Sequence, residues 1–309
     1  MMNLIQKIKK FMHLHQTIED VVKFYIERTE KKVDKLQLYH MKQTALNSTE
    51  RGVTNAKISD HEVIVSLTSY SKRIHEVYLA IESIMQGTIK PNRIILWLTE
   101  EEFKGKNLPI MLQKQVERGL EIMYCPDLRA YKKIVPTLKL YPESIIVTID
   151  DDLIYEPDLL EHLISSYQEH PECVSACRTE LIKTDKDGKP LGYMQWGLKE
   201  HLDYPSHFNF LTGGGGTLFP PHSLHKEAIK ENVFMTLCPK SDDVWLNAML
   251  LLNGVKVCKA FTHDAHGEDF YYNVSPHVGT LWAENQRPDG NDVQLKAVWE
   301  KYDLYKLLR

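Results

Sequence analysis

The chain has 309 residues, of which 43% are hydrophobic and 26% are charged, and this balance is ordinary for a soluble globular protein. Its formal net charge of -4 excludes the global positive field that recruits DNA or RNA, so we expect no nucleic-acid partner. The length fits one large α/β domain with an appendage, although length alone also allows two small domains.

The cysteines and the apolar runs indicate the cellular compartment of the protein. The five cysteines are odd in number, form no CxxC pair and lie mostly in apolar runs, so we expect reduced, buried thiols. No apolar run approaches the roughly 20 residues needed to cross a bilayer. The basic N-terminus lacks the apolar core and cleavage site of a signal peptide. These features favour a cytoplasmic protein.

Residues 1–50 are predicted to form an N-terminal helical extension, because apolar residues recur in them at helical spacing. A thin apolar seam runs among many charges, through Val22, Ile26, Val33 and Leu36. The favoured interpretation is a helical hairpin whose seam packs on another helix or on the main domain. The alternative is peripheral attachment to the anionic inner face of the plasma membrane through Lys7, Lys9 and Lys10.

After a polar linker at 47–60, short apolar runs alternate with helical patterns. We expect strands at 62–68, 93–98, 120–124 and 145–149, and helices at 75–86, 109–118 and 136–142. Near-continuous apolar strands separated by helices indicate a mostly parallel sheet with helices on both faces. Ligands of such sheets bind beyond the carboxyl ends of the strands.

The second half of the chain is less regular. We expect a helix that begins at Pro157, a strand at 173–177 and an irregular, aromatic-rich stretch from 178 to 210. The remaining expected elements are a turn at the four glycines 213–216, a helix at 241–253, a strand at 255–258 and an amphipathic helix at 292–308.

Asp150, Asp151 and Asp152 directly follow the apolar run IIVTI. Three carboxylates at the exposed end of a buried strand repel one another, and a hard divalent cation that shares its ligand shell with phosphate oxygens would relieve the repulsion. The alternative is a hydrated turn that caps the helix at Pro157. The position after the fourth strand of an alternating α/β half favours a metal.

This strand and its TIDDD continuation resemble the DxD motif of A-type glycosyltransferases, in particular the family 2-like bacterial enzymes. The resemblance covers the order of elements over about 60–265 and not the N-terminal helices. It implies the nucleotide-diphospho-sugar transferase (GT-A) fold. It also implies that Asp150 and Asp152 hold Mn2+ or Mg2+, with Asp150 and Asp151 beside the ribose or diphosphate of the donor.

Two further segments are candidates for donor binding. The resemblance places the segment SLTSYSKR near the nucleotide base, with Thr68, Ser69, Tyr70 and Arg73 as the contacts. A plain strand-to-helix turn with a surface arginine is the competing interpretation. Basic residues beside a helix N-terminus suit a diphosphate, and this predicts a role for Arg129, Lys132 and Lys133. The alternative is a solvated surface loop.

Asp242 and Asp243 follow Ser241 at the start of an apolar helix. Helix capping explains this pattern on its own. The segment also resembles the ED motif of inverting A-type transferases, although Asp242 stands where glutamate is usual. The resemblance implies that Asp243 deprotonates the acceptor hydroxyl beside Asp242, and general-base help is worth on the order of 10²–10⁴ in rate.

The glycines at 213–216 form no P-loop, because no Lys-Ser/Thr pair follows them. In the resembling enzymes a glycine-rich turn borders the donor and acceptor pocket, whereas the plain alternative is a flexible hairpin. The same enzymes often complete the metal shell with a late histidine. This makes His263 the predicted third ligand, ahead of His266, and a hydrogen-bonded surface histidine is the alternative.

The expected function is that of a metal-dependent, inverting glycosyltransferase. It would move a sugar from a nucleotide-sugar, with UDP-sugar the expected class, to a hydroxyl of a glycan or glycolipid acceptor, in bacterial surface polysaccharide synthesis. Residues 60–270 would form the catalytic domain and 271–309 a C-terminal tail. Two rivals stay open: a sugar-nucleotide nucleotidyltransferase, whose glycine-rich signature SLTSYSKR lacks, and a non-catalytic carbohydrate-binding protein of the same fold. Retaining chemistry is a further alternative, which the anomeric configuration of the product would decide.

Overall fold

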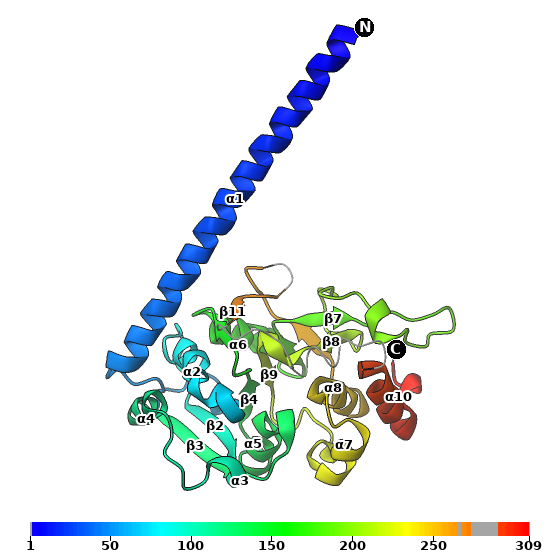
Figure 1. Ribbon diagram of the computed structural model, residues 1–309. Coiled ribbons are helices and arrows are strands. Elements are labelled where there is room, and N and C mark those ends of the chain that lie inside the picture. The colour runs from blue at the N-terminus through cyan, green and yellow to red at the C-terminus, as the bar shows by residue number, and fades with distance from the viewer. Residues whose placement is uncertain (1, 265–266, 273–289, 309) are drawn as a thin grey trace. The chain divides into compact units, whose positions relative to one another are not determined.

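The computed structural model describes residues 2–264, 267–272 and 290–308 (Figure 1). The chain divides into two compact units, Met1–Asn47 and Ser48–Arg309. Within the described part of the chain, no helix is both long and apolar enough to span a membrane.

The first unit is a single helix, α1 (Met2–Asn47), so the prediction of a helical hairpin is wrong. Residues 2–47 contain no glycine or proline, and therefore nothing in this stretch turns the chain. The side chains of the predicted seam are exposed at Val22, Ile26, Val33 and Leu36, so no second helical segment of α1 packs on them. The side chains of Lys7, Lys9 and Lys10, on which membrane attachment was predicted, lie outside the described ones.

The second unit is built on a seven-stranded sheet in the order β10-β6-β9-β4-β1-β2-β3. Only β9 runs antiparallel to its neighbours β4 and β6, which confirms the expected mostly parallel sheet. The strands are β1 (Val63–Thr68), β2 (Arg93–Thr99), β3 (Leu120–Cys125), β4 (Ile145–Thr148), β6 (Val174–Ala176), β9 (Thr217–Phe219) and β10 (Val257–Lys259).

Helices cover both faces of this sheet, as expected from the near-continuous apolar strands (Figure 1). On one face Ser66 of β1 and Trp97 of β2 hydrogen-bond Thr137 of α5. The alternate residues of the same strands point to the other face and are equally buried. The helices of this unit are α2 (Tyr78–Met85), α3 (Glu100–Phe103), α4 (Ile110–Glu117), α5 (Val135–Leu140), α6 (Leu159–Glu169), α7 (Glu231–Leu237), α8 (Asp242–Leu252) and α10 (Gly290–Tyr302).

Several short elements were not predicted. Four strands of three residues each form two small antiparallel ribbons, β5 (Leu153–Tyr155) with β11 (Phe270–Tyr272) and β7 (Thr179–Leu181) with β8 (Asn209–Leu211). Three residues are too few to show an alternating pattern. The 3-10 turns are η1 (Ser71–His75), η2 (Arg129–Lys133), η3 (Tyr193–Gln195), η4 (Gly213–Gly215), η5 (Lys226–Ile229) and η6 (Leu304–Lys306).

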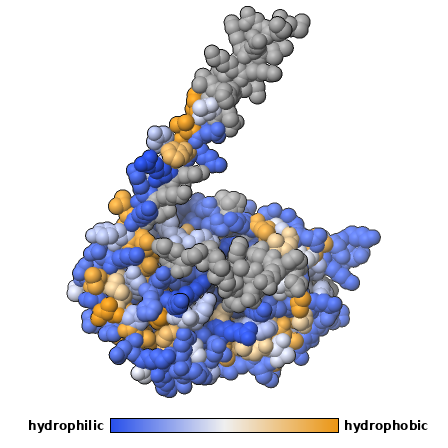
Figure 2. Space-filling view, viewed as in Figure 1, coloured by the Kyte–Doolittle hydropathy of each residue, from blue (hydrophilic) through white to orange (hydrophobic). Residues whose placement is uncertain are grey.

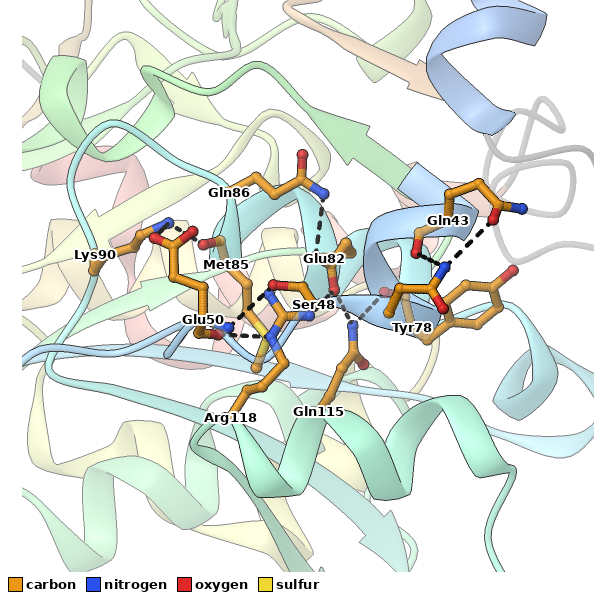
Figure 3. Close-up of polar contacts among 11 residues, drawn as sticks. Gln43, Ser48, Glu50, Tyr78, Glu82, Met85, Gln86, Lys90, Gln115 and Arg118 are labelled. Atoms are coloured by element: carbon orange, nitrogen blue, oxygen red, sulfur yellow. Dashed lines mark hydrogen bonds and ion pairs between the residues drawn. The ribbon is translucent and has the colours of Figure 1, made fainter. Parts of the chain in front are cut away.

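The expected linker is docked onto the sheet unit from Glu50 onward. The backbone N–H of Gly52 donates to the carbonyl of Arg118 at 2.9 Å. Arg118 in turn donates to the carbonyl of Glu50 at 2.7 Å and to the fully buried carboxylate of Glu82 at 2.7 Å, and Gln115 reaches the same carboxylate oxygen at 3.0 Å (Figure 3). Because a buried charge needs both a partner and hydrogen bonds, this network fixes the segment against α2 and α4.

The C-terminal helix belongs to the same unit as the sheet. Leu295, Val298 and Trp299 of α10 are buried in the core cluster that also contains Trp245 of α8. The predicted tail at 271–309 therefore contributes a core helix, while its residues 273–289 lie outside the described ones.

On the face of the unit drawn in Figure 2, hydrophilic residues cover most of the coloured surface and hydrophobic residues are scattered among them.

Candidate active site

The three consecutive aspartates form a turn between β4 and β5 at the carboxyl edge of the sheet. The backbone N–H of Asp150 donates to the hydroxyl of Tyr155 at 2.8 Å. That hydroxyl donates in turn to the carbonyl of Gly214 at 3.0 Å. The buried Tyr155 thus ties the acidic turn to the glycine turn. Sequence reasoning missed this residue, because nothing local marks one tyrosine among the apolar residues of a three-residue strand.

Arg73 forms ion pairs with two of the three aspartates. Its guanidinium lies 2.7 Å from Asp151 and 3.0 Å from Asp152. Ser69 donates to the second oxygen of Asp151 at 2.6 Å. Burial raises the pKa of Asp151 to about 6, although Arg73 and the Ser69 hydrogen bond act in the opposite direction. Ser69 and Arg73, both predicted donor contacts, hold the acidic turn in place.

Lys133 joins the two acidic segments. Its ammonium lies 2.8 Å from Asp150 and 3.0 Å from Asp242, and only 7% of its side chain is exposed. Burial alone would lower the pKa of Lys133, but the carboxylates of Asp150, Asp242 and Asp243 raise it well above its ordinary value. The structure therefore brings the start of α8 to the carboxyl edge of β4, although the two segments are some ninety residues apart in sequence.

These contacts correct one premise of the sequence argument. The sequence argument is that a divalent cation would relieve the repulsion among the three aspartates. In the structure Arg73 and Lys133 already compensate part of that negative charge. Repulsion by itself therefore does not predict a metal.

Asp243 stands beside Asp242 in the first turn of α8 and is half-buried. Its Oδ1 atom accepts the backbone N–H of Gly213 at 3.0 Å. Burial, and then the neighbouring charge of Asp242, raise the pKa of Asp243 to about 7, while Lys133 acts in the opposite direction. Ser241 stands at the N-cap of α8 but its side chain makes no capping hydrogen bond. The plain capping interpretation of this segment accordingly loses its main contact.

The glycine run is a packed turn, not the slack hairpin of the alternative interpretation. A Cβ on Gly213 would lie 2.9 Å from Nζ of Lys133 and 3.1 Å from Oδ1 of Asp243. A Cβ on Gly214 would lie 3.4 Å from Oδ2 of Asp150. Gly216 has a φ of +93°, which a side chain would make strained. The turn therefore lets backbone approach the acidic residues from both segments.

The other predicted donor residues have structural contacts of their own. Lys132 is buried and donates to Thr99 at 3.0 Å and to Asp127 at 2.8 Å, so it faces away from the contacts of its neighbour Lys133. Arg129 donates to the carbonyl of Pro239 at 3.1 Å, and Thr68 donates to the carbonyl of Trp97 at 2.9 Å. Their predicted contacts with a donor stay predictions.

Tyr70 and His263 are the last two of the predicted site residues. Tyr70 is exposed, and its ring lies under the guanidinium of Arg73 at 5.4 Å. His263 lies 2.7 Å from Asp158, in a group that also contains His162. The structure thus places the predicted third metal ligand with different partners from Asp150 and Asp152. His266 lies outside the described residues.

The donor set at the acidic turn fits a hard divalent cation. Asp150 and Asp152 offer carboxylate oxygens, and their side chains are 33% and 24% exposed, so solvent reaches both. Nζ of Lys133 donates to Oδ1 of Asp150. Oδ2 of the same carboxylate lies on the side of Gly214 where a side chain would stand in another residue. Oxygen ligands that are partly open to water suit Mn2+ or Mg2+.

Comparison with known proteins gives a distant likeness. No protein-family model and no curated protein matches the chain. Among solved structures, 4-diphosphocytidyl-2C-methyl-D-erythritol synthase aligns with a TM-score of 0.40 and 11% identity, over 72% of this chain and 98% of its own. The S. aureus TarS 1-349 complex with UDP aligns with a TM-score of 0.43 and 13% identity, over 70% of this chain and 61% of its own.

A third similar structure is the mannosyltransferase PcManGT from Pyrobaculum calidifontis in complex with GDP-Man and Mn2+. It aligns with a TM-score of 0.43 and 12% identity, over 88% of this chain and 80% of its own. At these scores the fold class rests on the sheet order of the chain itself, which is that of an α/β protein with a mostly parallel sheet.

Proposed function

We propose that this chain is a glycosyltransferase that uses a nucleotide-sugar donor. The observation that carries the proposal is the contact of Lys133 with both Asp150 and Asp242. It joins an oxygen-rich turn at the carboxyl edge of the sheet to the carboxylate pair at the start of α8, of which Asp242 is buried and Asp243 half-buried. A site for a diphosphate and a site for a proton acceptor then lie side by side.

In this proposal the acidic turn serves the diphosphate of the donor. Asp150 and Asp152 hold Mn2+ or Mg2+, which supplies positive charge against the leaving nucleoside diphosphate. Lys133 adds a fixed positive charge at the same edge. Thr68 and Tyr70 lie at the end of β1, where the nucleoside of the donor would bind, and Tyr70 offers an exposed ring for stacking.

Asp243 is the proposed general base. Its pKa of about 7 lets the carboxylate accept a proton from a sugar hydroxyl at neutral pH. Asp242 raises that pKa, and the N–H of Gly213 orients the accepting group. Attack on the anomeric carbon from the side opposite the leaving diphosphate would invert its configuration. A UDP-sugar donor and a glycan or glycolipid acceptor, in surface polysaccharide synthesis, complete the proposal.

A screen of nucleotide-sugars with Mn2+ tests the proposal. We expect one donor to release its nucleoside diphosphate in an acceptor-dependent manner, and the product to have the inverted anomeric configuration. D152N should lose metal-dependent donor binding and keep its fold. Release of pyrophosphate from a nucleoside triphosphate and a sugar phosphate would identify a nucleotidyltransferase instead. Glycan binding without turnover, unchanged in D152N, would identify a carbohydrate-binding protein.

A further inference from the structure

A second group of potential metal ligands lies at the far end of β5 from the acidic turn. Asp152 directly precedes β5, and Asp158 follows it at the N-terminus of α6. His162 stands one helical turn further along α6, and His263 lies in the segment between β10 and β11. One ligand atom from each of Asp158, His162 and His263 lies within 4.8 Å of the other two.

The three side chains converge on a small volume. Nε2 of His263 is 2.7 Å from Oδ2 of Asp158, and Nε2 of His162 is 3.7 Å from the same oxygen. The two imidazole rings are 5.3 Å apart between centroids. In a tetrahedral zinc site with bonds of about 2.0 Å, ligand atoms stand about 3.3 Å from one another. Small side-chain rotations therefore suffice to bring these atoms to a common ion.

The surrounding structure holds this group in place. Both carboxylate oxygens of Asp269 accept backbone N–H groups of the His263 segment, at 2.6 Å from residue 263 and 2.7 Å from residue 264. The carbonyl of Asp269 accepts the N–H of Glu156 at 3.3 Å, next to the pairing of β11 with β5. The segment that carries His263 is thus anchored to the strand that leads to Asp158.

One atom of the group has no hydrogen-bond partner among the described residues. Oδ1 of Asp158 is buried, and no donor in the described part of the chain reaches it. A buried carboxylate oxygen without a donor is costly unless a cation or water satisfies it. The ring of Phe261 borders both histidines and gives one side of the site an apolar wall. Its centroid lies 4.9 Å from the ring centroid of His162 and 5.6 Å from that of His263.

We propose that Asp158, His162 and His263 bind a transition-metal ion of the zinc class, separate from the cation of the acidic turn. Two imidazole nitrogens and one carboxylate oxygen suit Zn2+ and Co2+, whereas Mg2+ and Ca2+ prefer oxygen ligands alone. His263 is 59% exposed, which leaves one coordination position open to water. The ion would clamp α6 to the segment before β11. This proposal does not depend on the proposed function.

Cobalt titration of the full chain tests the proposal. The protein is first stripped with a chelator, and Co2+ is then added alone while the visible d–d absorption is recorded. We expect saturation at one ion per chain, and loss of the bands when Zn2+ is added. Because removing a supporting group alone weakens metal sites about 10–100-fold, H263A and H162A should each weaken Co2+ binding by more than about tenfold.

The matched control is H222A. His222 also lies beside a carboxylate, 3.0 Å from Glu143, but it belongs to no three-ligand group among the described residues. H222A and D152N should both keep the cobalt spectrum, and retention in D152N separates this site from the acidic turn. Absence of d–d bands in the wild type, or equal binding by H263A and wild type with unchanged circular dichroism, would overturn the proposal. His263 is exposed, so H263A tests the site without disturbing the core.

Discussion

The carboxylates at the two ends of β5 have different kinds of partner. Before the strand, Asp150, Asp151 and Asp152 form ion pairs with the permanent cations Lys133 and Arg73. After it, Asp158 faces two imidazoles, which are cationic only when protonated. The cations at the first end therefore keep their charge over the whole neutral pH range, whereas the charge at the second end depends on protons or a metal. Internal cations make an acidic site a stable part of the fold before any ligand arrives.

The largest effect is expected from removing the proposed base. D243N keeps the volume of the side chain and loses its basicity, so turnover should fall by about 10²–10⁴-fold once a donor is known. Donor binding should change little, because Asp243 is proposed to act on the acceptor. Initial rates and donor affinity measured on the same preparation check this. A variant with near wild-type turnover would remove Asp243 from the mechanism.

The next effect concerns the bridge between the acidic segments. K133M removes the common cation of the half-buried Asp150 and the buried Asp242, and loss of one partner of a buried ion pair costs up to about 3–5 kcal/mol. Urea unfolding measures the loss. The matched control is K139A, whose exposed pair with Glu231 should contribute less than about 1 kcal/mol. Equal stability of the two variants would contradict the bridging role.

A smaller loss is expected for the other internal cation. R73M removes the partner of Asp151 and Asp152, but this region is more open to solvent than Lys133 is. Unpaired polar groups cost about 1–3 kcal/mol, so R73M should lie between K133M and K139A in urea unfolding. The ranking would fail if R73M destabilised the chain more than K133M does.

The smallest effect is a shift in pH dependence. A base must be ionised to accept a proton, so turnover should fall about tenfold per unit below the pKa of Asp243 and level off above about 7. The charge of Asp242 helps to raise that pKa, and D242N should therefore move the ascending limb to lower pH. Rate profiles of both proteins between pH 5 and 9 provide the measurement. A limb at the same pH in both would exclude the coupling.

The sequence predicts the regular part of the fold better than the site. Strands β1 to β4 were expected at nearly their observed bounds, because apolar runs of four to seven residues leave a clear signal. The interior strand β9 was missed, since its three residues follow the glycine run. Patterning therefore identified the fold class, and the short elements that complete the sheet needed tertiary structure.

The limits at the site have a similar physical origin. The paired acids of the two segments were chosen from their positions after a strand and before a helix, and the structure does place Asp150 and Asp242 around one lysine. Lys132 and Lys133 are neighbours in one 3-10 turn and serve different carboxylates, which no sequence pattern distinguishes. The contact of His263 with Asp158 spans 105 positions of sequence and was equally invisible.

The ribbon of β5 and β11 gives the molecule a short mechanical link. Leu153 pairs with Tyr272 and Tyr155 pairs with Phe270, so one ribbon carries an acidic turn at one end and an imidazole group at the other. Thermodynamic reciprocity then governs any ion that orders this element. If a ligand bound at one end changes the binding affinity at the other end by some factor, a ligand bound at that other end changes the affinity at the first end by the same factor. Zinc in the surrounding solution would in that case act as an effector of donor capture.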